Sequence, residues 1–563
     1  MKLLKQLSLV VFLAVPIFGF AQQQINLPDD LGQISGNVQV LFQQYNEDSA
    51  IGAVTPPEQA TMNAFTNLNY RRGKFSAGIR YESYLPRQAG YPNRFTGTGL
   101  GYRYAAFTQE NLSVTIGNFY EQFGNGLVLR SYEERNLGLD NAMDGVKVNY
   151  SPLAGVYLKG VYGKMRYNFN DGLINTDGYV RGIDGEIFVN QLKESWLSAK
   201  TQVILGGSFV SKYQRDNRSD LVLPENVGSW AGRMTVQRGP ISVMGEYAYK
   251  INDPSQDNGY IYKDGRALLM NLTYATRGFS FTFDAKSIDN FSFRPDRSLQ
   301  ITDATINFLP AMTRQHSYIL AGTFYPYATQ FNGEVAFMAE TAFKIPRSDA
   351  KWNKYGMDVI VSFAQAYNPD TTHIASVEDG QRNGYRTNNF LSPGDQLNFS
   401  DFHIVLDKKW SKMWKTKFSY YNFVYNNDVN QGAYFLDGSA VKGNVYADVF
   451  IAEINTKLKK KHNLRSVFQY MRTDQHQGDW IAAVFEYSVS PHWIFAVLNQ
   501  YNLGNPKEDN KLHYPFGSVT YVNGGNRFSV EYGKRRAGIF CVGGVCRPVP
   551  ASNGLTLTIT SSF

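Results

Sequence analysis

Residues 555–563, the last nine of the chain, read LTLTITSSF and decide the fold expected for the whole sequence. Side chains alternate between the two faces of a strand, so Leu555, Leu557, Ile559 and Phe563 share one face, and Thr556, Thr558, Thr560 and Ser562 share the other. One apolar face and one hydroxyl face suit the closing strand of a transmembrane barrel, whose outside meets lipid and whose inside meets a polar lumen.

The same ending resembles the C-terminal signal by which the assembly machinery of the bacterial outer membrane recognises its barrel substrates. In this sequence the positions that match the signal are Leu557, Ile559 and the terminal Phe563. The resemblance implies that the barrel-assembly machinery is a partner during biogenesis.

An export signal is expected at the other end of the chain. Met1–Lys5 contain two lysines, Leu7–Phe20 form an apolar run, and Gly19–Ala21 make a small-residue cleavage site. The apolar run is too short to span a membrane comfortably. Residues 1–21 are therefore predicted to be a removed signal peptide, and residues 22–32 a short periplasmic segment before a barrel at 33–563.

Composition limits the fold class further. No uninterrupted apolar stretch of membrane-helix length follows the signal, and the mean hydropathy of −0.34 does not suit a helical membrane protein. Aromatic residues make up 15% of the chain, with 37 Tyr and 38 Phe, and there are 50 Gly. This composition favours strands, tight turns and interfacial aromatic girdles, so an all-β fold is predicted.

Amphipathic strands recur along the chain and predict one large antiparallel barrel of about 24–26 strands. In Phe75–Tyr84 the apolar residues alternate with Ser76, Gly78, Arg80 and Glu82. A count of 26 requires Ile301–Leu309 as a strand; without it a second segment must also go, which gives about 24, because both ends of the barrel lie in the periplasm. A soluble all-β propeller is the alternative.

Short turns alternate with long loops, which predicts the two sides of the barrel. The short turns at Arg71–Arg72, Lys459–His462 and Ser490–His492 are expected in the periplasm. The expected external loops are Glu121–Ala142, Lys164–Asp177, Arg215–Gly228, Pro369–Leu397, Asn426–Gly443 and the tip at Cys541–Cys546.

Ordinary side chains cannot fill a lumen of this width. Water, another protein, or infolded external loops such as Pro369–Leu397 are expected to occupy it. Candidate lumen charges are Arg80, Glu82, Glu246, Lys250, Asp284, Lys286, Lys415, Lys417, Glu453, Lys457 and Glu531. They could steer solutes through a conduit. Their mixed signs favour the alternative, a wall of cross-strand pairs that holds register.

The loop Asn118–Gly145 is the most distinctive of the long loops. Its charged residues are Arg130, Glu133, Glu134, Arg135, Asp140 and Asp144. Pairing of the loop with the wall is favoured over cation binding, because the carboxylates lack the regular spacing of a calcium loop.

The two cysteines stand in the hexapeptide CVGGVC, with Cys541 and Cys546 at its ends. A two-residue Gly-Gly turn pairs Val542 with Val545 and places the cysteines opposite each other in the next pair, at a separation that a disulfide accepts. Because an exported protein meets oxidising conditions, a structural disulfide is predicted, with reactive thiols as the alternative.

No motif indicates catalysis, a cofactor or a bound metal. None of the seven His sits in a paired metal spacing or beside a nucleophile elbow. The protein is therefore not expected to be an enzyme, although a site assembled from several strands would escape local motifs. The net charge of +8 is dispersed along strands, so nucleic acid is not expected as a partner.

Four segments resemble a family of large Bacteroidota outer-membrane barrel proteins of unknown function. They are the signal ending at Ala21-Gln22, FYEQFGNGLVLRSYEE from Phe119, NGEVAFMAE over Asn332–Glu340, and RAGIFCVGGVCRPVPASNG over Arg536–Gly554. The resemblance implies a barrel in the bacterial outer membrane and carries over no catalytic or ligand residue. The sequence does not resemble TonB-dependent receptors, which have an N-terminal plug domain before the barrel.

Two functions are consistent with these expectations. The first, slightly favoured, is a channel or transporter for solutes. The second is a non-conducting structural or accessory subunit of a multi-protein outer-membrane complex for protein export or barrel assembly. Membrane lipid, lipopolysaccharide and other outer-membrane proteins are the expected partners of the mature barrel.

Overall fold

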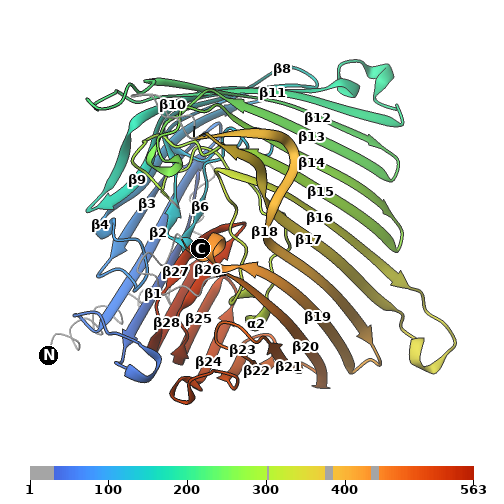
Figure 1. Cartoon of the computed structure of the whole chain (residues 1–563). Coiled ribbons are helices and arrows are strands. Elements are labelled where there is room, and N and C mark those ends of the chain that lie inside the picture. Colours follow the sequence, from blue (N-terminus) through green and yellow to red (C-terminus); the bar gives the residue numbers. More distant parts are fainter. Residues whose placement is uncertain (1–30, 301–302, 375–383, 433–442) are drawn as a thin grey trace.

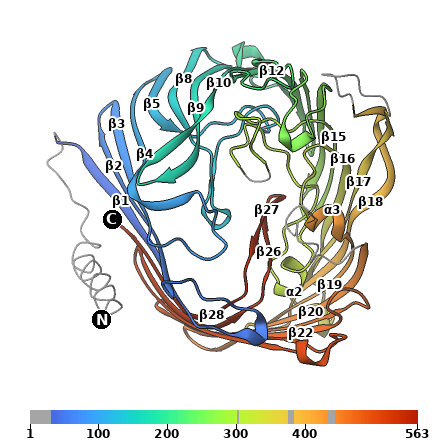
Figure 2. The ribbon, with the colours of Figure 1, turned by 60° about the vertical axis from the view of Figure 1, so that its left-hand side comes forward.

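The computed structural model describes residues 31–300, 303–374, 384–432 and 443–563, and its main feature is one closed sheet (Figures 1 and 2). Twenty-four strands form the wall, each antiparallel to the strands before and after it, and β28 pairs with β1 to close the cylinder. The predicted all-β barrel is confirmed, with the lower of the two strand counts.

The wall strands are β1 (Gln33–Tyr45), β2 (Ala60–Arg72), β3 (Phe75–Tyr84), β4 (Phe95–Gln109), β5 (Leu112–Phe119), β8 (Met143–Leu153), β9 (Val156–Asn170), β10 (Leu173–Phe188), β11 (Thr201–Tyr213), β12 (Asn226–Arg238), β13 (Ile241–Lys250), β14 (Gly265–Thr276), β15 (Phe279–Asp289), β16 (Gly333–Ile345), β17 (Met357–His373), β18 (Tyr385–Lys409), β19 (Trp414–Asn426), β20 (Asn444–Lys459), β21 (His462–Arg472), β22 (Trp480–Val489), β23 (Trp493–Asn502), β24 (His513–Asn523), β25 (Asn526–Arg535) and β28 (Ser552–Ser562).

Short elements lie in the connections. The paired strands outside the wall are β6 (Glu133–Glu134) with β7 (Leu139–Asp140), and β26 (Gly538–Val542) with β27 (Val545–Val549). The helices are α2 (Ile319–Gly322) and α3 (Asn427–Gln431), and the 3-10 turns are Ser49–Ile51, Arg135–Leu137, Val189–Gln191, Glu194–Trp196, Gln256–Asn258, Lys351–Asn353 and Glu508–Asn510. No helix among the described residues is long and apolar enough to cross a membrane.

Alternation along β3 shows which face of the wall is outside. Phe75, Ile79 and Tyr81 are 63%, 46% and 48% exposed, whereas Arg80 and Glu82 are 3% and 0% exposed. A closed sheet has no free edge, so the backbone polar groups of its strands pair with one another within the bilayer. The apolar side chains on its outer face are suited to lipid. The protein is therefore an outer-membrane barrel whose outer face contacts lipid.

The first and last strands join in the register that closes the barrel. Val40 lies opposite Ile559 and Phe42 opposite Leu557. The backbone amide of Gly36 donates to the Phe563 carbonyl at 2.9 Å, and the Phe563 amide donates to the Gly36 carbonyl at 3.0 Å. The start of β1 and the end of β28 thus lie at the same rim, together with most of the short turns, as an even number of strands requires.

The prediction of a strand at Ile301–Leu309 is wrong for residues 303–309, the part of this range that the structure describes. Residues 303–309 contain no strand and belong to the connection between β15 and β16, which enters the lumen. The strand was expected in order to reach an even count of 26; instead Ile306 and Leu309 are buried, at 0% and 1% exposure, in the core inside the barrel.

The external loops also need correction. The loop Glu121–Ala142 and the tip at Cys541–Cys546 fold into the lumen rather than outward (Figure 2). Most of Lys164–Asp177 and the described parts of Pro369–Leu397 lengthen β9–β10 and β17–β18. The described residues 369–374 and 384–397 are thus strand extensions and not the infolded loop that was one of the expected occupants of the lumen.

Three expectations lie partly or wholly outside the described residues. They are the signal peptide at 1–21, most of the segment 22–32, and most of the loop Asn426–Gly443, of which α3 is described. Residues 214–225 connect β11 to β12 where the loop Arg215–Gly228 was expected.

Candidate functional site: the occupied lumen

Three connections fill much of the lumen. All three enter from the rim opposite the one where β1 begins and β28 ends. We name them the first infolded segment (residues 120–142), the second infolded segment (residues 290–332, with 301–302 not described) and the hairpin segment (residues 536–551). Figure 2 shows them inside the ring of strands. Their apolar side chains join inward-facing wall residues in buried clusters, for example Phe123, Leu309 and Phe324 with Tyr425 and Trp480.

Buried ion pairs hold the first infolded segment to the wall. Arg166 of β9 contacts Glu82 of β3 at 2.7 Å and Asp140 of the segment at 2.8 Å. Arg80 pairs with Glu82 at 2.7 Å, with Asp140, and with Glu133 at 3.1 Å. The expected pairing of this loop with the wall is what the structure contains.

Other candidate lumen charges contact the second infolded segment. The Lys250 ammonium donates to the Ser292 carbonyl at 2.8 Å, and the Lys286 ammonium donates to the Pro310 carbonyl at 2.6 Å. The Tyr318 hydroxyl donates to Glu453 at 3.0 Å. Lys286 also pairs with Glu334 of the neighbouring β16 at 2.7 Å, and Glu453 with Arg465 of the neighbouring β21 at 2.9 Å. These side chains therefore form cross-strand pairs, as expected, and also hold the infolded chain.

Of the remaining candidates, Glu246 contacts the first infolded segment, and the others have partners on the wall or form no ion pair. The Glu246 carboxylate accepts from the Asn125 amides, and Asp284 accepts from Asn271 at 2.7 Å. Lys415 pairs with Asp407 at 2.8 Å and Glu531 with Arg535 at 2.6 Å. Among the described residues, Lys417 and Lys457 form no ion pair.

The hairpin segment carries the disulfide predicted between Cys541 and Cys546. Their Cα atoms are 4.1 Å apart, and they lie opposite each other as expected, with Val542 opposite Val545. Gly543 and Gly544 have φ of 59° and 86°, the left-handed geometry of a tight hairpin turn, which glycine adopts at little cost. The predicted disulfide is present in the structure.

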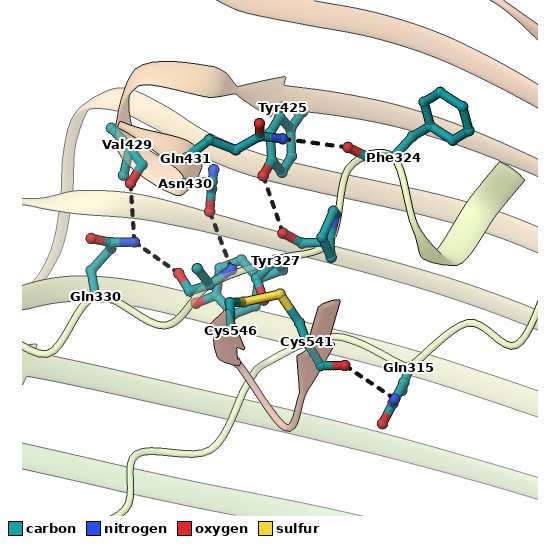
Figure 3. The surroundings of a disulfide bond; sticks show 12 residues. Gln315, Phe324, Tyr327, Gln330, Tyr425, Val429, Asn430, Gln431, Cys541 and Cys546 are labelled. Carbon is teal, nitrogen blue, oxygen red and sulfur yellow. Dashed lines mark hydrogen bonds between the residues drawn. A yellow bond between two sulfur atoms is a disulfide. The ribbon is translucent and has the colours of Figure 1, made fainter. Parts of the chain in front are cut away.

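The disulfide tip packs on the second infolded segment, not in solvent (Figure 3). The Gln315 amide donates to the Cys541 carbonyl at 3.3 Å, and the Thr329 amide donates to the Gly544 carbonyl at 3.1 Å. Cys546 is 1% exposed. The hairpin segment therefore braces the second infolded segment.

Arg536 holds the base of the hairpin segment. Its guanidinium lies 3.6 Å from the centre of the Phe324 ring and donates to the Thr323 carbonyl at 3.0 Å. Burial lowers the pKa of Arg536 to about 10. Burial and the nearby Arg536 charge together lower the pKa of His476 to about 4, so this imidazole is neutral at physiological pH.

Two cavities lie beside the hairpin segment. The first, of about 410 Å³, borders β1, β2 and β28 through residues such as Gln43, Asn63 and Thr556. The second, of about 800 Å³, borders the connections at 56–58 and 86–94. Their shared lining residues are Gln88, Ala89, Tyr91 and Arg547. The two spaces thus adjoin at Arg547.

One buried group contains the donor types of a metal site. The side chains of His316, Asp401 and His403 each offer a ligand atom, and these atoms lie within 4.8 Å of one another. His316 comes from the second infolded segment and the other two from β18. Local spacing could not reveal the group, because a stretch of 84 residues separates His316 from Asp401 and no paired His spacing links the three residues.

Sequence reasoning also missed Arg166, Arg536 and Arg547. Alternation along β9 could have indicated Arg166 as a lumen residue. No periodic signal exists for Arg536 and Arg547, because Arg536 precedes and Arg547 follows the hairpin turn in a segment that leaves the wall.

Solved barrel structures show low similarity to this chain. The siderophore receptor PirA from Pseudomonas aeruginosa is 10% identical, with a TM-score of 0.40 over 94% of this chain and 81% of the other. OccK3 (OpdO) from the same organism is 10% identical, with 0.36 over 79% and 98%. The P pilus usher (PapC) translocation pore is 8% identical, with 0.38 over 94% and 99%.

No curated protein matches the sequence. A family model does match it, over residues 1–563. This chain, whose barrel encloses three infolded segments of its own, belongs to the Family of unknown function (DUF6029).

Proposed function

We propose that this outer-membrane barrel is a channel or transporter that passes small polar or anionic solutes between the hairpin segment and the wall. The observation that carries the proposal is the pair of adjoining cavities at Arg547. The second cavity lies at the connections of the rim opposite the one where β1 begins and β28 ends. The first cavity lies deeper in the barrel, against residues of β1, β2 and β28. Together they mark a side passage past the infolded segments.

The charge of the first cavity supports an anionic preference. Arg135, Arg535 and Arg547 line it, and no Asp or Glu of the described chain does. Arg135 pairs with Glu133 and Arg535 with Glu531. Fixed positive charge in a narrow space of low dielectric raises the local concentration of anions.

Arg547 is the residue at the narrow junction. Its guanidinium donates to the Asn136 carbonyl at 2.6 Å and to the Gly90 carbonyl at 2.7 Å, and it forms no ion pair within the described residues. These bonds tie the hairpin segment to two neighbouring connections. Because they leave its charge without a carboxylate partner, Arg547 can contact a passing anion.

The test is conductance of the purified barrel in a planar bilayer under a KCl gradient. We expect small steady currents that favour chloride over potassium. In Arg547→Gln we expect the reversal potential to shift toward the equilibrium potential of potassium. Arg218→Gln, which changes an exposed ion pair with Asp220 outside both cavities, is the matched control and leaves selectivity unchanged. A barrel without any current contradicts the proposal.

A non-conducting subunit of a larger outer-membrane complex is the second candidate. The closely packed interior favours it, and so does a groove of about 510 Å³ on the outer face of β18–β21, lined by apolar residues that include Phe418, Phe450 and Phe468. Stoichiometric co-purification with other envelope proteins in mild detergent, combined with no conductance, would support this reading.

The cellular setting is part of the same proposal. We propose export by the signal peptide at 1–21 in a bacterium of the Bacteroidota, assembly by the barrel-assembly machinery, and contact with lipopolysaccharide in the outer leaflet. The protein is proposed to be no enzyme.

A further inference from the structure

The group formed by His316, Asp401 and His403 lies where the second infolded segment meets the wall. The Nε2 atom of His316 is 2.7 Å from one Asp401 oxygen, and the Nδ1 atom of His403 is 3.0 Å from the other. Thr313 donates a hydroxyl hydrogen bond to Asp401 at 3.1 Å. The Asp401 and His403 side chains are each 1% exposed and that of His316 is 9% exposed.

Asp401 lacks the Lys or Arg partner that Glu82 and Glu334 have. Glu82 pairs with Arg166 and Glu334 with Lys286. Among the described residues no Lys or Arg forms an ion pair with Asp401, whose ion-pair contacts are the two imidazoles. A buried carboxylate without a nearby positive charge is strongly disfavoured. A bound cation would supply that charge.

One ring nitrogen of His403 has no partner. The Nδ1 atom contacts Asp401, but Nε2 is buried and has no hydrogen-bond partner in the described structure. The ring also lies 5.3 Å from the centre of the Tyr421 ring. A buried polar atom without a partner is costly, and such an atom calls for an explanation such as an ion that the ring binds.

We propose that His316, Asp401 and His403 bind a divalent first-row transition-metal ion, with Zn²⁺ as the reference ion. Two imidazoles and one carboxylate are a donor set that such ions take. Ligand atoms about 2.0–2.1 Å from a tetrahedral ion lie about 3.3 Å from one another. The observed spread within 4.8 Å therefore requires only small side-chain rotations.

A small cavity offers room for the fourth ligand. It has a volume of about 60 Å³, and Thr313, His316, Phe399 and Gly544 are among its lining residues. Since a water molecule takes roughly 30 Å³, the cavity has room for one or two. A water ligand can complete the coordination there, beside the tip of the hairpin segment.

The proposed ion would tie the second infolded segment to β18. His316 precedes Tyr318 and α2, which contact Glu453 of β20 and Gln469 of β21. Metal binding at His316 would thus fix the segment on a wall that it already contacts. The proposal does not depend on whether the barrel conducts.

Metal content of the full-length barrel in detergent tests the site. The folded protein is incubated with Zn²⁺, desalted and analysed by mass spectrometry for metal per barrel. We expect about one Zn²⁺ for the wild type and its loss in His316→Gln, His403→Gln and Asp401→Asn. His476→Gln is the matched control, because it also removes a histidine that contacts the second infolded segment, through Tyr325, and is expected to retain the ion.

Cobalt gives a second measurement that does not depend on content alone. Co²⁺ in a four-coordinate site with imidazole ligands gives visible absorption bands, and we expect these in the wild type and in His476→Gln but not in His316→Gln. Heat-dependent gel mobility confirms that each variant is folded. Wild-type protein that binds no more Zn²⁺ than His316→Gln, or His476→Gln that loses the ion equally, overturns the proposal and leaves hydrogen bonds alone between Asp401 and the two imidazoles.

Discussion

Arg166 shows how single residues tie the infolded chain to the wall. It is 1% exposed and contacts both Glu82 of the wall and Asp140 of the first infolded segment. Removal of one partner from a buried ionic network leaves uncompensated charge, which costs more than the pair itself contributes. The network is thus a strong determinant of where the segment lies.

The variant Arg166→Met is expected to lower the free energy of unfolding by about 3–5 kcal/mol, because Glu82 and Asp140 then share Arg80 alone. Denaturant unfolding of the refolded barrel in detergent measures the change. Lys344→Gln is the control, since its pair with Asp358 is exposed and its loss should cost less than about 1 kcal/mol. Equal, small effects for both variants would refute this role for Arg166.

Alternation alone placed Arg80 and Glu82 on the lumen face of β3. It could not name their partners, because Asp140 and Arg166 come from distant parts of the chain. The same limit hid the His316 group. A period of two assigns a face to each residue, but it contains no information on which loop reaches that face.

The hairpin segment shows what a single element encodes. Its turn and disulfide were predictable because all six residues of CVGGVC interact within one tight turn. Its inward direction was not, because that depends on contacts with Gln315 and Thr329 more than two hundred residues earlier.

The double variant Cys541→Ser, Cys546→Ser is expected to fold but to loosen the hairpin segment. A crosslink that closes so short a loop contributes about 2 kcal/mol in the chain-entropy model. Hydrogen exchange measured by mass spectrometry should become faster over 538–549, while exchange in β28 stays unchanged as the internal control. Unchanged exchange over the hairpin would mean that packing on the second infolded segment holds it without the disulfide.

The whole molecule depends on the closure between β1 and β28. The carboxyl-terminal Phe563 exchanges backbone hydrogen bonds with Gly36, and its ring lies so close that a side chain at Gly36 would collide with it. The terminal residue therefore takes part in the seam and is also the position that matches the assembly signal.

Phe563→Ala is expected to reduce the yield of folded barrel in cells without preventing refolding in detergent, because the backbone pairing of β28 remains. Heat-dependent gel mobility of outer-membrane fractions and of refolded protein measures the two yields. Ser562→Ala, next to it on the other face, should behave as wild type. A similar loss in both assays would assign Phe563 to barrel stability and not to recognition during assembly.

By itself the sequence determined the barrel, its outward and inward faces, the disulfide pair and, within two, the number of strands. These follow from interactions between residues close in the chain and from a two-residue period that lipid imposes on every strand. Only the tertiary structure decided what occupies the lumen, since burial inside a closed wall depends on contacts between segments far apart. For that reason residues 303–309, expected to belong to a strand, pack inside the barrel and are no part of its wall.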